Sequence, residues 1–510
     1  MSLFSARAVQ FVAALAFAGT PALLGCDGVP ASVVQSRQVG EARQGAAART
    51  LHLAPCRVKG ADGDARCGSL SVYENRRLGT GRRLSLNIVV LRARVERARR
   101  PEPIFLLTGG PGLGAATEAW TANLIGPARD DHDVVLVDQR GTGASAALDC
   151  DLYSDAPSAF LGKRFPVNAV RACRDSLERR ADLTQYTTPI AADDLDDVRI
   201  ALGYPVIDVV GFSYGAKLAL VYLRQHPTNV RRVVVDGVVT TRYPTPLPAA
   251  RVADGALRRV FADCAAERAC ARVYPTLEGD FHRAVRRLAG APTGVTLTSV
   301  HGLLRRSATL SEQAFKVGIW SLLYSSDGAR EVPSIVHRAG DGDFTYGARI
   351  IAENNQHRWK RGSVGAMLSI LCSEDVPFIG PAAVERADAA SLLGAPLSFE
   401  LIDACVGWPR ASLPAGYRDP VRSDVPVLLL SGELDPVLPA DYATEAARSL
   451  SHGMHVIRPG AGHVDDDDCT IGLMAEFLDM ADPSRLVASC ATRSRRPPFI
   501  ERDATRIIAP

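Results

Sequence analysis

The chain reads Gly211-Phe212-Ser213-Tyr214-Gly215 between an apolar run, Ile207 to Val210, and a stretch typical of a helix, Ala216 to His226. A strand that turns sharply into a helix at Gly-x-Ser-x-Gly is a nucleophile elbow, in which the glycines leave room for a strained backbone that exposes the serine hydroxyl. The helix N-terminus beneath it favours developing negative charge. The sequence therefore predicts Ser213 as a nucleophile.

A serine nucleophile needs a base, and the base needs an orienting carboxylate. On a strand-turn-helix scaffold of this kind they are expected after the serine, in the order Asp and then His. Val425 to Leu430 has the pattern of a buried strand, and Asp435 lies in the loop that follows it. His463 lies in a glycine-rich loop after a further short apolar segment. We expect Asp435 and His463 to complete a catalytic triad, with Glu433 as the alternative acid.

The negative oxygen of an acyl-transfer intermediate is usually held by two backbone N–H groups, one of them from the residue after the serine. That residue is Tyr214. The second donor is expected in the loop Thr108 to Gly112, which follows the apolar run Ile104 to Leu107 and carries little side chain to block a substrate. Gly110 is the predicted second donor, and Gly109 is its alternative.

Several segments together resemble the proline iminopeptidase and tripeptidyl aminopeptidase branch of the α/β-hydrolases. They are Gly109 to Gly112, Val137 to Gly143, Gly211 to Gly215, Ser431 to Asp435, and Gly462 with His463. The cysteine-rich C-terminal part and Cys405 to Pro409 are more similar to the secreted bacterial tripeptidyl aminopeptidases. The resemblance covers about residues 50 to 495.

This resemblance implies an α/β-hydrolase fold, with a mostly parallel central sheet flanked by helices and an inserted, mainly helical cap. It also implies a serine exopeptidase that removes amino acids or short peptides, such as tripeptides, from a free N-terminus. Many members of the branch have histidine where this chain has Thr108, so proline specificity does not follow from the resemblance.

An aminopeptidase must bind a cationic α-amine, which calls for carboxylates in a partly desolvated pocket. Glu374 and Asp375, near Cys372, are the candidates, and the alternative for them is a solvated acidic pair or a helix cap. If the enzyme is instead a carboxylic-ester hydrolase with the same triad, neither residue is needed. The expected reaction uses no metal and no organic cofactor, and the sequence contains no Cys-x-x-Cys pair of the kind that binds zinc.

The N-terminus has the features of an export signal. Arg7 supplies a positive charge, Ala8 to Leu24 is mostly apolar, and Leu23-Leu24-Gly25-Cys26 resembles a bacterial lipobox. Cys26 is then the lipidated first residue of the mature protein. A competing cleavage site at Ala16 to Ala18 would give simple secretion. We predict an exported protein on the periplasmic side of a bacterial membrane, held only by its N-terminal lipid anchor, or a secreted one.

The number of cysteines is consistent with the predicted export. The chain has eleven cysteines, and lipidation of Cys26 leaves ten, an even number suited to disulfides in an oxidising compartment. Ten cysteines allow on the order of a thousand connectivities, and we predict pairing of near neighbours along the chain. The predicted pairs are Cys56 with Cys67, Cys150 with Cys173, Cys264 with Cys270, Cys372 with Cys405, and Cys469 with Cys490.

Composition is ordinary for a globular protein, with 47% hydrophobic residues among 510 and a net charge of +3. Basic residues occur as short scattered pairs, which gives no support for nucleic-acid binding. The sequence does not indicate an oligomeric state. The predicted organisation is a signal peptide (1–25), a tether (26–50), the first part of the hydrolase core (51–244), a helical cap (245–400), the second part of the core with a C-terminal region like that of the tripeptidyl aminopeptidases (401–495), and a tail (496–510).

Overall fold

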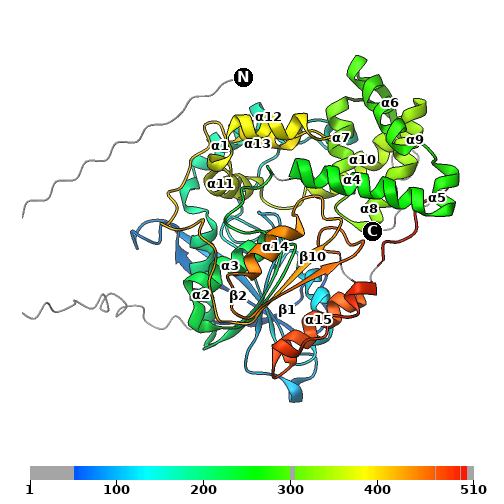
Figure 1. Cartoon of the computed structure of the whole chain (residues 1–510). Coiled ribbons are helices and arrows are strands. Elements are labelled where there is room, and N and C mark those ends of the chain that lie inside the picture. The colour runs from blue at the N-terminus through cyan, green and yellow to red at the C-terminus, as the bar shows by residue number, and fades with distance from the viewer. Residues whose placement is uncertain (1–50, 248, 299–304, 466, 494, 502–510) are drawn as a thin grey trace, which may run out of the picture. The chain divides into compact units, whose positions relative to one another are not determined.

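The apolar runs of the sequence, together with two more polar strands at one edge, form one nine-stranded sheet with strand order β1-β2-β3-β5-β4-β6-β7-β10-β11. Figure 1 shows this sheet among its helices. The computed structural model describes residues 51–247, 249–298, 305–465, 467–493 and 495–501. The strands are β1 (Ala54–Cys56), β2 (Ala65–Tyr73), β3 (Arg83–Leu91), β4 (Ile104–Leu107), β5 (Val134–Val137), β6 (Ile207–Phe212), β7 (Val230–Asp236), β10 (Val427–Gly432) and β11 (Gly453–Arg458). The predicted signal peptide, tether and lipidation residue Cys26 lie outside the described residues.

Strands β5, β4, β6, β7, β10 and β11 run parallel to their neighbours, whereas β1, β2 and β3 are antiparallel additions at one edge. Every residue of β4, β5, β6 and β10 is buried. This is the burial expected for parallel strands that are covered by helices on both faces. The predicted mostly parallel sheet is confirmed, and β6 lies near its centre between β4 and β7.

Two apolar clusters cover the two faces of the sheet. Alternation along β6 sends Val209 into one cluster and Val210 into the other. The first cluster packs against α1 (Val167–Glu178), α2 (Thr188–Leu202), α3 (Tyr214–Gln225) and α14 (Ala440–Ala447), and the second packs against η2 (Ala119–Arg129) and α15 (Asp468–Asp479). Figure 1 shows α2 and α3 on one side of the sheet and α15 on the other.

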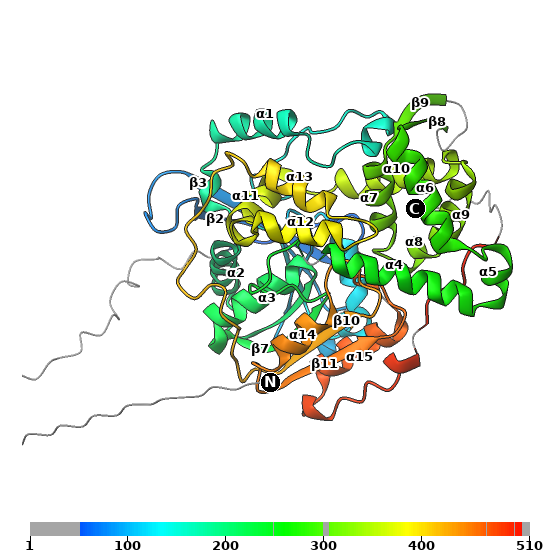
Figure 2. The same ribbon diagram turned by 45° about the horizontal axis from the view of Figure 1, so that its top comes forward.

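The chain between β7 and β10, called the helical layer below, is mainly helical (Figure 2). Many of its apolar side chains belong to a third buried cluster. The helical layer contains α4 (Ala249–Ala266), α5 (Arg268–Val273), α6 (Leu277–Gly290), α7 (Glu312–Leu322), α8 (Ser326–Ala329), α9 (Val332–Asp341), α10 (Thr345–Trp359), α11 (Val364–Glu374), α12 (Pro381–Ala389) and α13 (Pro396–Ala404), together with the hairpin of β8 (Thr293–Thr298) and β9 (Arg305–Leu310). Phe160 and Leu161 of η3 (Pro157–Leu161), far earlier in the chain, are buried in the same cluster. Residues from outside the predicted cap therefore also pack in the helical layer. The limits of the cap at 245 and 400 stay a prediction.

Five disulfides join the cysteine pairs that near-neighbour pairing predicts, with Cα–Cα distances from 5.1 to 5.8 Å. The bond between Cys372 and Cys405 connects α11 to the residue after α13. These bonds are compatible with an exported protein. Among the described residues, no single helix is both long and apolar enough to cross a membrane, and only the bent pair of helices Val364–Phe378 and Pro381–Ala389 passes that test together.

Candidate active site

Ser213 lies at the turn between β6 and α3, with a φ of 56°. This left-handed conformation is uncommon for a residue with a side chain. The turn also explains both motif glycines: a Cβ on Gly211 would lie 2.3 Å from the carbonyl oxygen of Gly215, and a Cβ on Gly215 would lie 2.2 Å from the carbonyl oxygen of Leu107. The strand, the helix and the neighbouring β4 can approach this closely only because the side chains are absent.

His463 connects Ser213 to a buried carboxylate. Its Nε2 lies 2.8 Å from Ser213 Oγ, and its Nδ1 lies 2.7 Å from Asp435 Oδ2. Glu433, the alternative acid, instead forms an ion pair with Arg259 at 2.8 Å. The structure therefore brings Ser213, His463 and Asp435 into one chain of hydrogen bonds, and Glu433 lies outside it.

The carboxylate of Asp435 is held in place by the loop after β10. Its Oδ1 accepts hydrogen bonds from the backbone N–H groups of Val437 at 2.8 Å and Leu438 at 2.9 Å, and the residue is 3% exposed. One oxygen is thus fixed by the loop while the other faces His463. This is the orientation that keeps a proton on Nδ1 and leaves Nε2 free to accept one.

Tyr324, a residue of the helical layer, holds the loop of His463 in place. The backbone N–H of His463 donates to the carbonyl oxygen of Tyr324 at 2.8 Å, and the Tyr324 ring meets the imidazole edge-on, with 5.4 Å between centroids. Tyr324 follows α7, which lies between β7 and β10 in the chain. No sequence pattern marked this contact, because it joins two loops that are 139 residues apart.

The loop after β4 lies directly beside the serine. A Cβ on Gly109 would lie 3.1 Å from Ser213 Cβ, and Gly110 has a φ of 112° that favours glycine. Tyr214 begins α3, so its N–H belongs to the first turn of that helix. Both predicted oxyanion donors, Tyr214 and Gly110, therefore lie on segments that border Ser213, and their roles stay a prediction.

Ser213 and His463 open into a cavity of about 450 Å³. Its lining comes from the loops at the carboxyl ends of β4, β6, β7, β10 and β11 and from the helical layer, where Trp320, Trp359 and Leu401 contribute apolar surface. Ligand sites of open α/β sheets collect at this end of the strands. The charged lining residues are Glu118, Arg164, Lys217, Arg358, Arg361, Asp375 and Asp465.

Glu374 and Asp375 are buried and paired with a cation. Lys217 Nζ lies 3.0 Å from a carboxylate oxygen of each. Glu374 also accepts from the N–H of Thr188 at 2.6 Å and from the hydroxyl of Tyr417. The cavity lining includes Asp375 and not Glu374, so the amine-binding prediction is kept for Asp375 alone.

The pKa values reflect this burial. Desolvation raises the pKa of Asp375 above its ordinary value, although Lys217 opposes the shift. For Lys217 desolvation acts in the opposite direction, but the charges of Asp375 and Glu374 outweigh it and raise its pKa. The cluster is thus a buried ion network that the nucleophile's own helix shares with α11.

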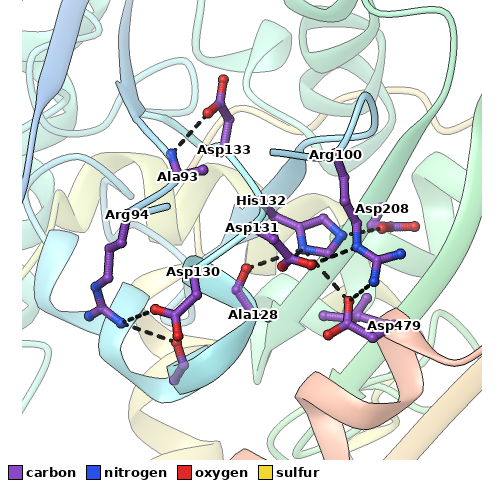
Figure 3. A network of polar contacts seen from close by, with 12 residues as sticks. Ala93, Arg94, Arg100, Ala128, Asp130, Asp131, His132, Asp133, Asp208 and Asp479 are labelled. Atoms are coloured by element: carbon purple, nitrogen blue, oxygen red, sulfur yellow. Dashed lines mark hydrogen bonds and ion pairs between the residues drawn. The ribbon is translucent and has the colours of Figure 1, made fainter. Parts of the chain in front are cut away.

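A second polar cluster lies where β5 and β6 begin, at the opposite end of the sheet from Ser213, which follows the end of β6. Figure 3 shows this cluster. Asp131, His132 and Asp479 bring possible metal-ligand atoms within 4.8 Å of one another. However, Arg100 donates to Asp131 at 2.7 Å and pairs with Asp479 at 3.3 Å, and His132 Nδ1 faces the carbonyl oxygen of Ala128 at 3.1 Å. His132 Nδ1 also lies 2.8 Å from Asp131 Oδ1, so it donates its proton between two oxygen acceptors, and Nε2 faces the guanidinium of Arg231 at 3.4 Å. Ion pairing accounts for this cluster.

Comparisons with known proteins agree with this architecture. The family described as alpha/beta hydrolase fold matches residues 102–466. The tripeptidyl aminopeptidase of Streptomyces lividans is 30% identical over 188 residues, which are 34% of this chain and 35% of that protein. The serine protease Hip1 of Mycobacterium tuberculosis is 28% identical over 440 residues, covering 78% of this chain and 82% of that protein. Among solved structures, a serine hydrolase from Cycloclasticus zankles has 13% identity and a TM-score of 0.35, covering 82% of this chain and 100% of that chain.

Proposed function

The chain belongs to the α/β-hydrolase fold family, and from that premise we propose that it is an exported serine aminopeptidase that releases amino acids or short peptides from free N-termini. The observation that carries the proposal is the hydrogen-bonded series Asp435, His463 and Ser213 at the wall of the cavity. The peptidase names of the relatives support a peptide substrate. The alignment spans only about a third of the tripeptidyl aminopeptidase.

In the proposed reaction, His463 takes the proton of Ser213 Oγ as this oxygen attacks the scissile carbonyl carbon. The N–H groups of Tyr214 and Gly110 donate to the oxyanion, and Asp435 stabilises the imidazolium. When the C–N bond breaks, His463 gives the proton to the leaving amine. Water then loses a proton to His463 and attacks the acyl-enzyme ester, which frees the acyl product and returns the proton to Ser213.

Asp375 is the carboxylate that we propose for the substrate amine, since it lines the same cavity as Ser213. The second candidate function is carboxylic-ester hydrolysis by the same triad. It is favoured by one observation, namely that Asp375 is already paired with Lys217 and also accepts from the N–H of Thr245 at 2.9 Å. An ester substrate would not require Asp375 to exchange these partners for an amine.

We also propose that residues 1–25 are a lipoprotein signal, with Cys26 lipidated and residues 26–50 acting as the tether. The five disulfides support export to an oxidising compartment. Mass spectrometry of the mature N-terminus tests this directly. A diacylated Cys26 supports the lipoprotein, and an unmodified N-terminus near Ala18 supports secretion instead.

The function is tested by kcat/KM on a tripeptidyl anilide with a free N-terminus, compared with its N-acetylated twin, and with Ser213→Ala as the blank. A strong preference for the free amine is expected. Equal rates on both, or turnover of simple esters alone, would keep the triad and discard the aminopeptidase, and turnover of esters alone would favour the esterase. Near-normal turnover by Ser213→Ala would remove the triad assignment altogether.

A further inference from the structure

The acidic side chains that line the cavity already have partners. Glu118 pairs with Arg361, and Asp375 pairs with Lys217. Asp465 accepts from the backbone N–H of Gly462 and from Ser326 at 3.1 Å. Because each carboxylate already has a partner, a cationic ligand group would have to share or displace that partner.

Two cationic side chains of the lining differ in this respect. Within the described residues, the guanidinium groups of Arg358 and Arg164 form no ion pair with any carboxylate. Glu400 accepts from the backbone N–H of Arg164 at 2.8 Å, and the Arg164 guanidinium contacts the sulfur of Met367 at 3.8 Å and lies 5.3 Å from the ring of Phe165. The cavity therefore holds two cations that have no carboxylate oxygen from the described part of the chain within 4.0 Å, although the carboxylate of Glu400 attracts Arg164 at longer range.

Arg358 is also close to the reacting groups. Its Cζ lies 3.5 Å from the centre of the Tyr324 ring, and the same ring meets the imidazole of His463. Burial, together with the nearby charges of Arg164 and Arg361, lowers the pKa of Arg358 to about 10. Arg164 and Arg358 line the same cavity and their charges repel, so a ligand carboxylate that bound both would relieve that repulsion.

We propose that Arg358 and Arg164 form a carboxylate subsite, so that the preferred substrate of Ser213 carries an anionic group that both guanidiniums bind. Guanidinium is suited to this task because its planar N–H groups match the geometry of a carboxylate. The carboxylate has two possible sources, an acidic side chain or the C-terminus of a short peptide. This inference deepens the proposed function and rests on it only for the peptide substrate, since an ester with a carboxylate would fit the same subsite.

The competing explanation is structural. Arg358 stacks on Tyr324, and Tyr324 holds the loop of His463. In that case loss of Arg358 would impair every substrate to the same degree, whereas a carboxylate subsite predicts an effect that depends on substrate charge. The contrast between charged and neutral substrates therefore separates the two explanations.

The experiment measures kcat/KM on three matched sets. The first set is free-amine tripeptidyl anilides with glutamate or glutamine at each position in turn. The second is short peptides with a free or an amidated C-terminus. The third is p-nitrophenyl hydrogen glutarate against p-nitrophenyl valerate, which lack an amine and so report on the subsite even if the aminopeptidase proposal fails.

Wild type is expected to prefer the anionic member of at least one set by about 10- to 100-fold, the usual contribution of a charge-assisted hydrogen bond. Arg358→Gln and Arg164→Gln should each remove most of that preference while neutral substrates change little. Arg358→Lys should keep part of it. Arg361→Gln is the matched control, because Arg361 lines the same cavity but is neutralised by Glu118, and it should keep the preference.

The three sets also identify the source of the carboxylate, because a side-chain ligand shows in the first set and a C-terminal ligand in the second. The proposal is overturned if wild type shows no charge preference in any set. It is equally overturned if the preference survives in both Arg358→Gln and Arg164→Gln, or if these variants slow charged and neutral substrates alike. Circular dichroism of each variant establishes that it is folded. If a glutamine variant does not fold, Arg358→Lys and the corresponding Arg164→Lys carry the test, and a preference unchanged in both would overturn the proposal.

Discussion

Replacement of Lys217 by methionine is expected to destabilise the protein strongly. Lys217 lies on α3, one turn after Ser213, and its side chain is 2% exposed. The side chains of its partners are equally enclosed, with Glu374 0% and Asp375 2% exposed. Methionine keeps most of the volume of lysine, so the variant changes chiefly the charge. Two buried carboxylates are then left without their cation.

The expected cost follows from these partners. Removing one member of a buried ion pair typically costs 3 to 5 kcal/mol, because the remaining charge is desolvated and uncompensated. We therefore expect the free energy of unfolding at pH 7.5 to fall by about 3 to 5 kcal/mol. The loss should be smaller at pH 5, since the pKa of Asp375 is already raised and its protonation would remove one of the two charges.

Urea denaturation, followed by tryptophan fluorescence, measures this change as a shift in the midpoint. Lys316→Met is the matched control: Lys316 pairs with Glu312 at 2.7 Å, but both side chains are partly exposed. An exposed pair of this kind contributes about 0.3 to 0.5 kcal/mol. The triple variant Lys217→Met, Glu374→Gln, Asp375→Asn removes all three charges and should recover much of the stability.

Two results would refute this reasoning. One is a Lys217→Met protein as stable as the Lys316→Met control. The other is a triple variant no more stable than Lys217→Met, which would show that packing, and not uncompensated charge, causes the loss.

Three further predictions concern the elbow, the disulfides and the sheet. Gly211→Ala would place a Cβ 2.3 Å from the carbonyl oxygen of Gly215. The clash should displace Ser213 and lower kcat/KM by about 100-fold. A kcat/KM within about threefold of wild type would contradict the close approach of the strand to the helix. Replacing Cys372 and Cys405 by alanine removes a bond that closes a separation of 33 residues and should lower the free energy of unfolding by about 4 kcal/mol. Removing the bond between Cys264 and Cys270, which closes a separation of 6, should lower it by about 2 kcal/mol. Thermal unfolding that ranked the two losses in the opposite order would argue against the chain-entropy explanation. Burial raises the pKa of Asp236 from 3.8 to about 6, so the native state binds the carboxyl proton more tightly than the unfolded state does. The free energy of unfolding should therefore fall by about 3 kcal/mol as the pH rises from 4 to above 6. Asp236→Asn should flatten that part of the profile, and an unchanged slope would exclude Asp236 as its source.

Much of the candidate site could be predicted from the sequence because its signals are local. The strand before Ser213, the small residues around it and the helix after it are contiguous in the chain, and they specify the elbow together. Asp435 and His463 were predicted because each follows an apolar strand, and the carboxyl ends of parallel strands meet at one edge of a sheet. Pairing of near-neighbour cysteines was one hypothesis among about a thousand connectivities, and the structure joins those pairs.

The charge environment of the site could not be predicted in the same way. Glu374 and Asp375 were predicted to bind an amine, but nothing in the sequence indicated that Lys217, more than 150 residues earlier in the chain, pairs with both carboxylates. Glu433 and Asp435 are two residues apart and equally acidic, and only the packing of their loop turns one toward His463 and the other toward Arg259.

The sequence by itself therefore determined the class of the fold, the strand-turn-helix that carries Ser213, and the order in which Asp435 and His463 follow it. Only the tertiary structure decided which charges are neutralised inside the cavity and which remain available, as Arg358 and Arg164 show. The physical reason is that strand, turn and helix preferences act between neighbours in the chain. Desolvation and ion pairing depend instead on which distant side chains the packing of the helical layer on the sheet brings within a few ångströms.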